Sequence, residues 1–312
     1  MSKALVVIKS MGIGDLSILI SNIHAISKKI AKPVTVLAQK NTRASSVLKH
    51  DPHVDEVIEL DEKESKGFFT IIKKIKPKKF DKSFIYSDSI RLYLITKFSG
   101  IKESFHYKFF SKKGKNFYKT AKEFSEKILQ KKIDSSSKIY WDQNEIEKAK
   151  KDYSIKSNVK NIVCGISASG PTKRWGIDNY IKLFQKINSK HPSKFFLAGG
   201  LNDEFLIEKV MSSVENCVSL SKLNIEKIIP IIASCQYYIG NDTGFGHLSA
   251  NLNSKCLMIF CDSPINYGLW NNNIRVILPA GETIESFVGH DALAKDKISF
   301  DEVLEKSLNL IN

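Results

Sequence analysis

The sequence predicts an α/β fold of two doubly wound domains, each built on an open parallel sheet with helices on both faces. Three observations support this prediction. The 312 residues suit two domains of roughly 150 residues each. Short β-branched runs alternate with segments of helical periodicity, as parallel sheets with crossover helices require. This alternation occurs twice, and a stretch of weak pattern separates the two series.

The first series begins with a β-branched run, a glycine turn and a segment with apolar residues at helical spacing. A basic amphipathic helix that ends near Pro77 follows later in the same series. Strands are expected at 4–9, 33–38, 54–60 and 80–86, and helices at 16–30, 70–79 and 88–98.

Between the two series, residues 101–156 are rich in lysine, serine and aromatic residues and show one helical segment at 119–131. We interpret 135–157 as the approach to an interdomain linker, which places the domains at 1–157 and 158–312. The last segment, 300–311, has an amphipathic pattern, and this helix could pack back on the N-terminal domain.

The second series repeats the alternation of strand and helix up to that last segment. Strands are expected at 161–167, 194–198, 217–220, 237–239 and 255–260, and helices at 178–188, 203–212, 225–233 and 244–251.

Composition favours a cytoplasmic protein. The N-terminus lacks the apolar segment and small-residue cleavage site of a secretory signal, and no run approaches the roughly 18 apolar residues of a membrane span. The five cysteines form no CxxC pair, which favours reduced buried thiols over a metal site.

The net charge of +15 is confined to the first half of the chain. Residues 1–157 contain 33 basic and 18 acidic residues, whereas residues 158–312 contain 15 of each. A compositional bias of the genome would act on both halves alike, so we expect the N-terminal half to meet something anionic. A phosphorylated lipid, a membrane surface and a nucleic acid all fit this charge.

Three loops that follow predicted strands have unusual polar content, and ligands of open α/β sheets collect at such loops. In the first loop, Gly12 and Gly14 permit a tight turn that places Asp15 at the start of a helix. The structural alternative is an aspartate that only caps the helix.

The second loop, 167–175, consists of small and hydroxylated residues and ends in two adjacent cations before Trp175. Lys173 and Arg174 offer positive charge to a phosphate group, and Ser169 and Thr172 offer hydrogen bonds. The alternative is a solvated basic turn with Trp175 as a packing anchor.

The third loop, 241–247, opens the helix expected at 244–251. The backbone N–H groups of Thr243 and Gly244 would face an anion with the help of the helix dipole, and His247 lies on the first turn. The alternative assigns Asp242 and Thr243 to capping and His247 to a satisfied core position.

In this third loop the chain resembles the ADP-heptose:lipopolysaccharide heptosyltransferases of glycosyltransferase family 9. The D-T-G-x-x-H string that starts at Asp242, the basic loop with Trp175 and the N-terminal Gly14–Asp15 pair follow that family's order and spacing. The likeness extends over most of the chain and is weakest at 109–156. It departs from the family at 261–264, where Cys-Asp-Ser-Pro replaces a Gly-Pro-Thr type of turn.

The resemblance implies a GT-B fold, in which two Rossmann-like domains face a central cleft, and a role for each matching residue. Asp15 matches the general base, Lys173 the cation on the donor phosphates, and Asp242 to Gly244 with His247 the start of the donor-binding helix. Ser169 matches a hydroxyl near the donor, Glu204 or else Asp203 the acid on the ribose, and Leu223 an apolar residue near the adenine.

The implied function is inverting, metal-independent transfer of a heptose or related sugar from ADP-heptose to the lipopolysaccharide inner core. It needs a nucleotide-sugar donor but no cofactor. The acceptor is an anionic glycolipid, which implies peripheral contact with the cytoplasmic face of the inner membrane by a monomeric enzyme.

Two alternatives remain open from the sequence. Another GT-B enzyme, either a glycosyltransferase for a different nucleotide sugar or an epimerase, would share the fold. A nucleic-acid-binding protein would explain basic residues interleaved with aromatic ones at 105–110, but not the neutral second half.

Overall fold

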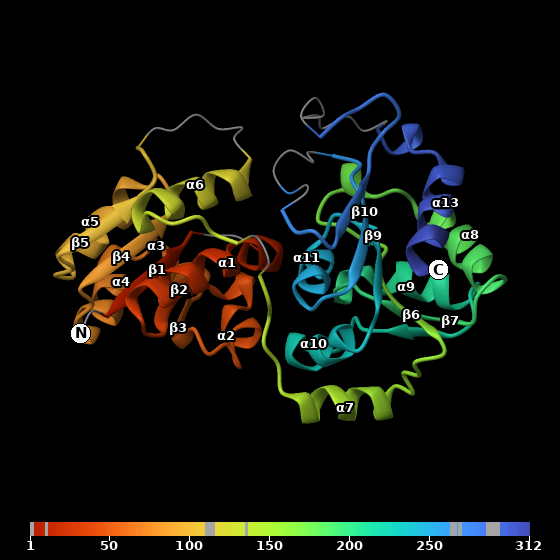
Figure 1. Cartoon of the computed structure of the whole chain (residues 1–312), viewed down its shortest axis with the longest axis horizontal. Coiled ribbons are helices and arrows are strands. Elements are labelled where there is room, and N and C mark those ends of the chain that lie inside the picture. Colours follow the sequence, from red (N-terminus) through yellow and green to blue (C-terminus); the bar gives the residue numbers. More distant parts are fainter. Residues whose placement is uncertain are drawn as a thin grey trace. The chain divides into compact units, whose positions relative to one another are not determined.

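The computed structural model describes residues 3–9, 12–109, 116–134, 137–262, 267, 270–284 and 294–312. The chain divides into two compact units, Met1–Tyr140 and Trp141–Asn312 (Figure 1). Each unit has its own parallel sheet, so the predicted α/β fold of two doubly wound units is confirmed.

The N-terminal unit is a five-stranded sheet in the order β3-β2-β1-β4-β5. Its strands are β1 (Ala4–Ile8), β2 (Val34–Gln39), β3 (Val54–Leu60), β4 (Lys82–Tyr86) and β5 (Glu103–His106). Its helices are α1 (Ile13–Ile30), α2 (Ala44–Val47), α3 (Glu62–Lys66), α4 (Phe68–Ile75), α5 (Ile90–Phe98) and α6 (Phe117–Leu129). All strand pairs are parallel.

Alternation along the central strand builds the two layers around this sheet. Leu5 and Val7 of β1 belong to an apolar cluster with Ile71 of α4 and Ile95 of α5. The helices α4 and α5 pack against each other, as do α1 and α6. The strand order reverses between β1 and β4, and α1 begins directly beyond the carboxyl end of β1.

The C-terminal unit is a six-stranded sheet in the order β11-β10-β9-β6-β7-β8. Its strands are β6 (Lys160–Gly165), β7 (Ser193–Leu197), β8 (Cys217–Ser219), β9 (Tyr237–Asn241), β10 (Lys255–Ile259) and β11 (Ile274–Ile277). Its helices are α7 (Gln143–Asp152), α8 (Ile177–Asn188), α9 (Glu204–Met211), α10 (Ile225–Ala233), α11 (Gly244–Asn251) and α13 (Phe300–Ile311).

Both ends of this unit bear on the expected domain division. The division between the units lies at Tyr140/Trp141, ahead of the 157/158 boundary, because α7 packs on α10 instead of linking the domains. Helix α13 is the segment that could pack back on the N-terminal domain, and its buried residues Val303, Leu310 and Ile311 lie in the core of the C-terminal unit. The apolar face of α13 therefore packs within the C-terminal unit, where the helix contacts α8.

Four of the five cysteines are buried, as predicted, and Cys217 is partly buried. All five are free thiols, and Cys164, Cys235, Cys256 and Cys261 are buried. Burial raises the pKa of each of these thiols, so they stay protonated and unreactive near neutral pH. No helix in the described part of the chain is both long and apolar enough to cross a membrane.

Candidate functional site in the C-terminal unit

The richest cluster of predicted site residues lies at the point where the strand order of the C-terminal sheet reverses, between β6 and β9. From β6 the chain proceeds to β7 and β8 on one side, then returns to β9 on the other side. The loops after β6 and β9 consequently leave the same edge of the sheet as neighbours. Open α/β sheets bind ligands at such a reversal.

Two glycines allow the ends of β6 and β9 to approach closely. Gly165 and Gly240 are paired in the register of the two strands. A Cβ on Gly240 would lie 2.5 Å from the backbone nitrogen of Gly165, and one on Gly165 would lie 1.9 Å from the hydroxyl of Tyr238. A side chain at Gly240 would therefore push the two strand ends apart, and one at Gly165 would displace the Tyr238 ring.

The buried amide of Asn241 joins the two loops. Its Oδ1 accepts a hydrogen bond from the backbone N–H of Trp175 at 3.1 Å. Its Nδ2 donates to the carbonyl oxygens of Ile166 at 3.2 Å and Ser167 at 3.4 Å. Asn241 thus ties both ends of the loop after β6 to the last residue of β9.

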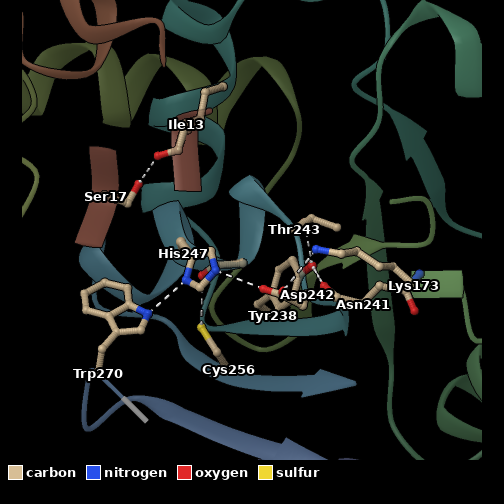
Figure 2. A network of polar contacts seen from close by, with 11 residues as sticks. Ile13, Ser17, Lys173, Tyr238, Asn241, Asp242, Thr243, His247, Cys256 and Trp270 are labelled. Carbon is tan, nitrogen blue, oxygen red and sulfur yellow. Dashed lines mark hydrogen bonds and ion pairs between the residues drawn. The ribbon is translucent and has the colours of Figure 1, made fainter. Parts of the chain in front are cut away.

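Lys173 and Asp242 face each other across this junction (Figure 2). The Nζ of Lys173 lies 4.0 Å from Oδ2 of Asp242 and 5.7 Å from the ring centroid of Tyr267. The Asp242 side chain is 7% exposed and that of Lys173 is 25% exposed. The carboxylate is therefore held inside the protein, whereas the ammonium group reaches solvent.

The other oxygen of Asp242 meets His247, and the partners of His247 define its protonation (Figure 2). The indole Nε1–H of Trp270 donates to Nδ1 of His247 at 2.9 Å. Since an indole N–H can only donate, Nδ1 carries no proton. The proton therefore sits on Nε2, which donates to Oδ1 of Asp242 at 3.0 Å. In this tautomer His247 holds the Asp242 carboxylate in place.

The sequence analysis did not predict a role for Trp270, because no motif surrounds this residue. Its role depends on the return of the chain beyond β10, which only the folded structure shows. His247 itself is 2% exposed and uses both ring nitrogens within the protein, as the alternative of a satisfied core histidine predicted.

Helix α11 begins between these charged groups. Thr243 is its N-terminal capping residue in extended conformation, and the Tyr238 hydroxyl lies 3.0 Å from Thr243 Oγ1. The first amides of a helix have no acceptor within the helix. Those of Gly244 and Phe245 lie on the partly exposed first turn, beside Asp242 and Lys173.

Within the loop after β6, two predicted ligands have structural partners. Arg174 donates from Nε and Nη2 to the carbonyl oxygen of Ala168, at 3.1 and 3.0 Å, and so closes the loop. Thr172 Oγ1 donates to Oδ2 of Asp262 at 3.1 Å. Ser169 is exposed at the tip of the loop. Trp175 is buried against Tyr180 and is the packing anchor of the loop.

The loops after β7 and β8 bring Glu204 and Leu223 to the same edge of the sheet. Glu204 opens α9 and forms an ion pair of 2.6 Å with Lys222, and this hydrogen bond raises the pKa of Lys222. Leu223 is half-buried beside Lys222. Asp203 is occupied differently: its Oδ2 accepts from the N–H of Gly200 at 3.0 Å and caps the short turn before α9.

In the N-terminal unit, Asp15 lies in the first turn of α1, at the reversal between β1 and β4. Its Oδ2 accepts a hydrogen bond from the backbone N–H of Gly12 at 2.8 Å, and Gly14 precedes it in the same turn. The capping role considered from the sequence is therefore real. It also orients the partly exposed carboxylate at the carboxyl edge of the sheet.

A metal site is not evident in the ranges that the structure describes, since they hold no group of three or more His, Cys, Asp or Glu side chains placed to share an ion.

Comparisons with known proteins place the chain in a family. The family model described as glycosyltransferase family 9 (heptosyltransferase) matches residues 115–295. Lipopolysaccharide heptosyltransferase 1 of Campylobacter coli is 29% identical over 136 residues, which are 42% of this chain and 40% of that protein. This curated relative is therefore matched over less than half of its length.

Two solved structures share the fold over nearly the whole chain. The ADP-heptose lps heptosyltransferase II of E. coli has a TM-score of 0.76 at 17% identity, with 99% of this chain and 98% of that chain covered. E. coli heptosyltransferase WaaC with ADP has a TM-score of 0.73 at 13% identity, with 98% and 99% covered. These likenesses establish the two-domain GT-B fold, and the family model spans more than half of the sequence. The chain belongs to glycosyltransferase family 9, the heptosyltransferase family.

Proposed function

We propose that this protein transfers a heptose, with inversion, from ADP-heptose to an acceptor in the lipopolysaccharide inner core. The observation that carries the proposal is the pairing of Lys173 with Asp242 beside the first turn of α11, at the reversal of the C-terminal sheet. A partly exposed ammonium group and a helix N-terminus together suit a diphosphate. ADP-heptose is taken as the donor because the structurally similar E. coli protein is an ADP-heptose heptosyltransferase.

The residues around Lys173 and the first turn of α11 have separate roles in this proposal. Lys173 and the amides of Thr243, Gly244 and Phe245 bind the donor phosphates, and Asp242 positions Lys173. His247 and Trp270 act through Asp242, because the ring nitrogens of His247 bond to Asp242 and Trp270. Arg174 keeps the loop closed through Ala168. It adds positive charge to the site without needing direct contact.

Four further residues complete the donor site. Ser169 and Thr172 offer hydroxyl oxygens from the loop after β6, and Glu204 offers a carboxylate to the ribose. Leu223 offers apolar contact to the base. These residues come from the loops after β6, β7 and β8, which all end at one edge of the sheet.

The reaction is a single displacement at the anomeric carbon. An acceptor hydroxyl oxygen attacks that carbon and forms the new glycosidic bond while the bond to the β-phosphate breaks. The electron pair of the broken bond leaves with ADP, and the hydroxyl proton passes to Asp15. Attack opposite the leaving group inverts the configuration, and Lys173 stabilises the charge that develops on the diphosphate.

The basic N-terminal half is the acceptor side in this proposal. Its excess of positive charge suits the phosphates and carboxylates of an anionic glycolipid, and the enzyme works as a monomer in the cytoplasm at the inner membrane.

Transfer itself is the first test. The purified protein, incubated with ADP-heptose and a Kdo–lipid A acceptor, should release ADP and yield a heptosylated product by mass spectrometry. The Asp15→Asn variant should lower kcat by at least about 100-fold, because a general base contributes roughly that factor or more. Asparagine can still accept the hydrogen bond from Gly12, so helix α1 should remain capped.

Wild-type rates in this variant would show that Asp15 is not the base. Binding of other nucleotide sugars but not of ADP-heptose would redirect the donor assignment, and binding of none would refute the glycosyltransferase proposal.

Lys173→Met should weaken ADP binding by about tenfold or more, because a charge-assisted hydrogen bond to phosphate is lost. Isothermal titration calorimetry with ADP measures this change. The matched control is Lys209→Met, since Lys209 is also paired with a carboxylate, Asp178 at 2.7 Å, but lies on the outer side of α9. Equal ADP affinity in both variants would show that Lys173 does not contact the diphosphate.

Transfer should continue at the full rate in EDTA. The reason is that the Lys173 ammonium group and the helix amides already compensate the charge on the leaving diphosphate. The initial rate with EDTA, compared with rates after addition of Mg²⁺ or Mn²⁺, tests this expectation. A strict requirement for either ion would overturn the metal-independent mechanism.

A further inference from the structure

Helix α5 of the N-terminal unit exposes an apolar stripe. Ile90, Leu94 and Phe98 lie at positions i, i+4 and i+8, and 43%, 39% and 63% of these residues are exposed. The opposite face of the same helix is also apolar and buries Leu92 and Ile95 in the core. A helix that covers a sheet normally carries polar residues on its outer face, so this stripe is not needed for the fold.

The stripe continues onto helix α4. Phe69 is the most exposed large apolar residue on this side, at 73%. The ring of Phe68 lies 5.3 Å from that of Phe69 and 5.9 Å from that of Phe98, and α4 packs against α5. Phe69, Ile90, Leu94 and Phe98 therefore form one surface, which we name the α4–α5 patch.

Cations without a carboxylate partner accompany this patch. Lys73 and Lys76 follow Phe69 by four and seven residues, and Lys97 follows Leu94 by three, so helical spacing sets each beside the apolar residues. Among the described residues no ion pair joins any of the three to a carboxylate. The Nζ of Lys97 donates instead to the carbonyl oxygen of Lys102 at 2.8 Å and lies 5.7 Å from the ring centroid of Tyr93, so its charge is not neutralised. The neighbouring lysines behave differently: Lys74 pairs with Glu64 at 2.7 Å and Lys78 with Glu56 at 2.5 Å.

This combination favours a lipid surface over a second copy of the chain. A two-fold dimer through the patch would bring the same lysines of both copies, none of which is neutralised by a carboxylate, into one interface. An anionic bilayer instead accepts aromatic rings at the boundary between headgroups and acyl chains, while lysine side chains extend their ammonium groups to the phosphates.

We propose that the α4–α5 patch docks the enzyme on an anionic phospholipid bilayer, with Phe69 and Phe98 inserted and Lys73, Lys76 and Lys97 on the headgroups. The proposal deepens the proposed function and rests on it for the location of the acceptor in that membrane. The proposal assigns the membrane contact to the α4–α5 patch, whereas the proposed function attributes it only to the basic charge of the N-terminal half.

Flotation of the full chain with vesicles tests the surface. The wild type should float with vesicles of phosphatidylethanolamine, phosphatidylglycerol and cardiolipin, and should float weakly with phosphatidylcholine alone. The double variant Phe69→Ser/Phe98→Ser should lower the partition coefficient by at least about tenfold, because two apolar side chains no longer leave water. The triple variant Lys73→Gln/Lys76→Gln/Lys97→Gln should lower it by about fivefold for each lysine, and this loss should vanish at high salt.

The matched control is Phe205→Ser. Phe205 is 64% exposed, close to the value for Phe98, but lies on α9 in the C-terminal unit, which carries no excess charge. This variant should float like the wild type, and thermal melting should show that all variants are folded. Equal flotation of the wild type and the Phe69/Phe98 variant would overturn the proposal. So would a wild-type dimer that the same variant converts to monomer, because the patch would then bind a second copy.

Transfer to a soluble, deacylated acceptor separates this proposal from the function. The Phe69/Phe98 variant should keep the wild-type rate on that acceptor. Transfer without vesicle binding by the wild type would refute the docking surface alone, and vesicle binding without transfer from any donor would refute the proposed function alone.

Discussion

The side-chain amide of Asn241 is the interaction on which the candidate site depends. It lies fully buried at the end of β9 and makes three hydrogen bonds to the loop after β6, at Ile166, Ser167 and Trp175. Those bonds satisfy backbone groups that would otherwise be buried without partners, at a cost of about 1–3 kcal/mol each. They also hold Lys173 close to Asp242, although the two residues come from different crossover units of the sheet.

The charges of the site follow from this junction. Asp242 is almost fully buried and would be costly there alone, but Lys173 faces one of its oxygens and His247 donates to the other. Trp270 donates to Nδ1 of His247 and thereby selects the tautomer whose Nε2–H points at Asp242. The first turn of α11 adds a partial positive charge at the same place. The result is a fixed set of donors beside one cation that reaches solvent.

Sequence reasoning predicted the βα alternation and the loops that carry the site, because hydrophobic periodicity and the D-T-G-x-x-H string are local signals. It did not predict the elements whose signal is tertiary. Helix α7 is almost entirely polar and buries only Ala149, so it read as a linker. Strand β5 is four residues long and half exposed, and β11 lies in a stretch without alternation. The hydrogen bonds of Arg174, Asn241 and Trp270 could not be predicted either. Their partners lie 6, 66 and 23 residues away, and no local pattern indicates them.

The affinity of an Asn241→Leu variant for ADP tests whether the hydrogen bonds of Asn241 hold the donor site together. Leucine keeps approximately the volume of the side chain but removes all three hydrogen bonds, so the loop that carries Lys173 is no longer tied to α11. In a variant shown to be folded by thermal melting, calorimetry should give a Kd for ADP at least about tenfold above that of the wild type. The reason is that Lys173 and the amides of α11 are no longer held in one arrangement before ADP binds. A folded variant that binds ADP as tightly as the wild type would contradict the account.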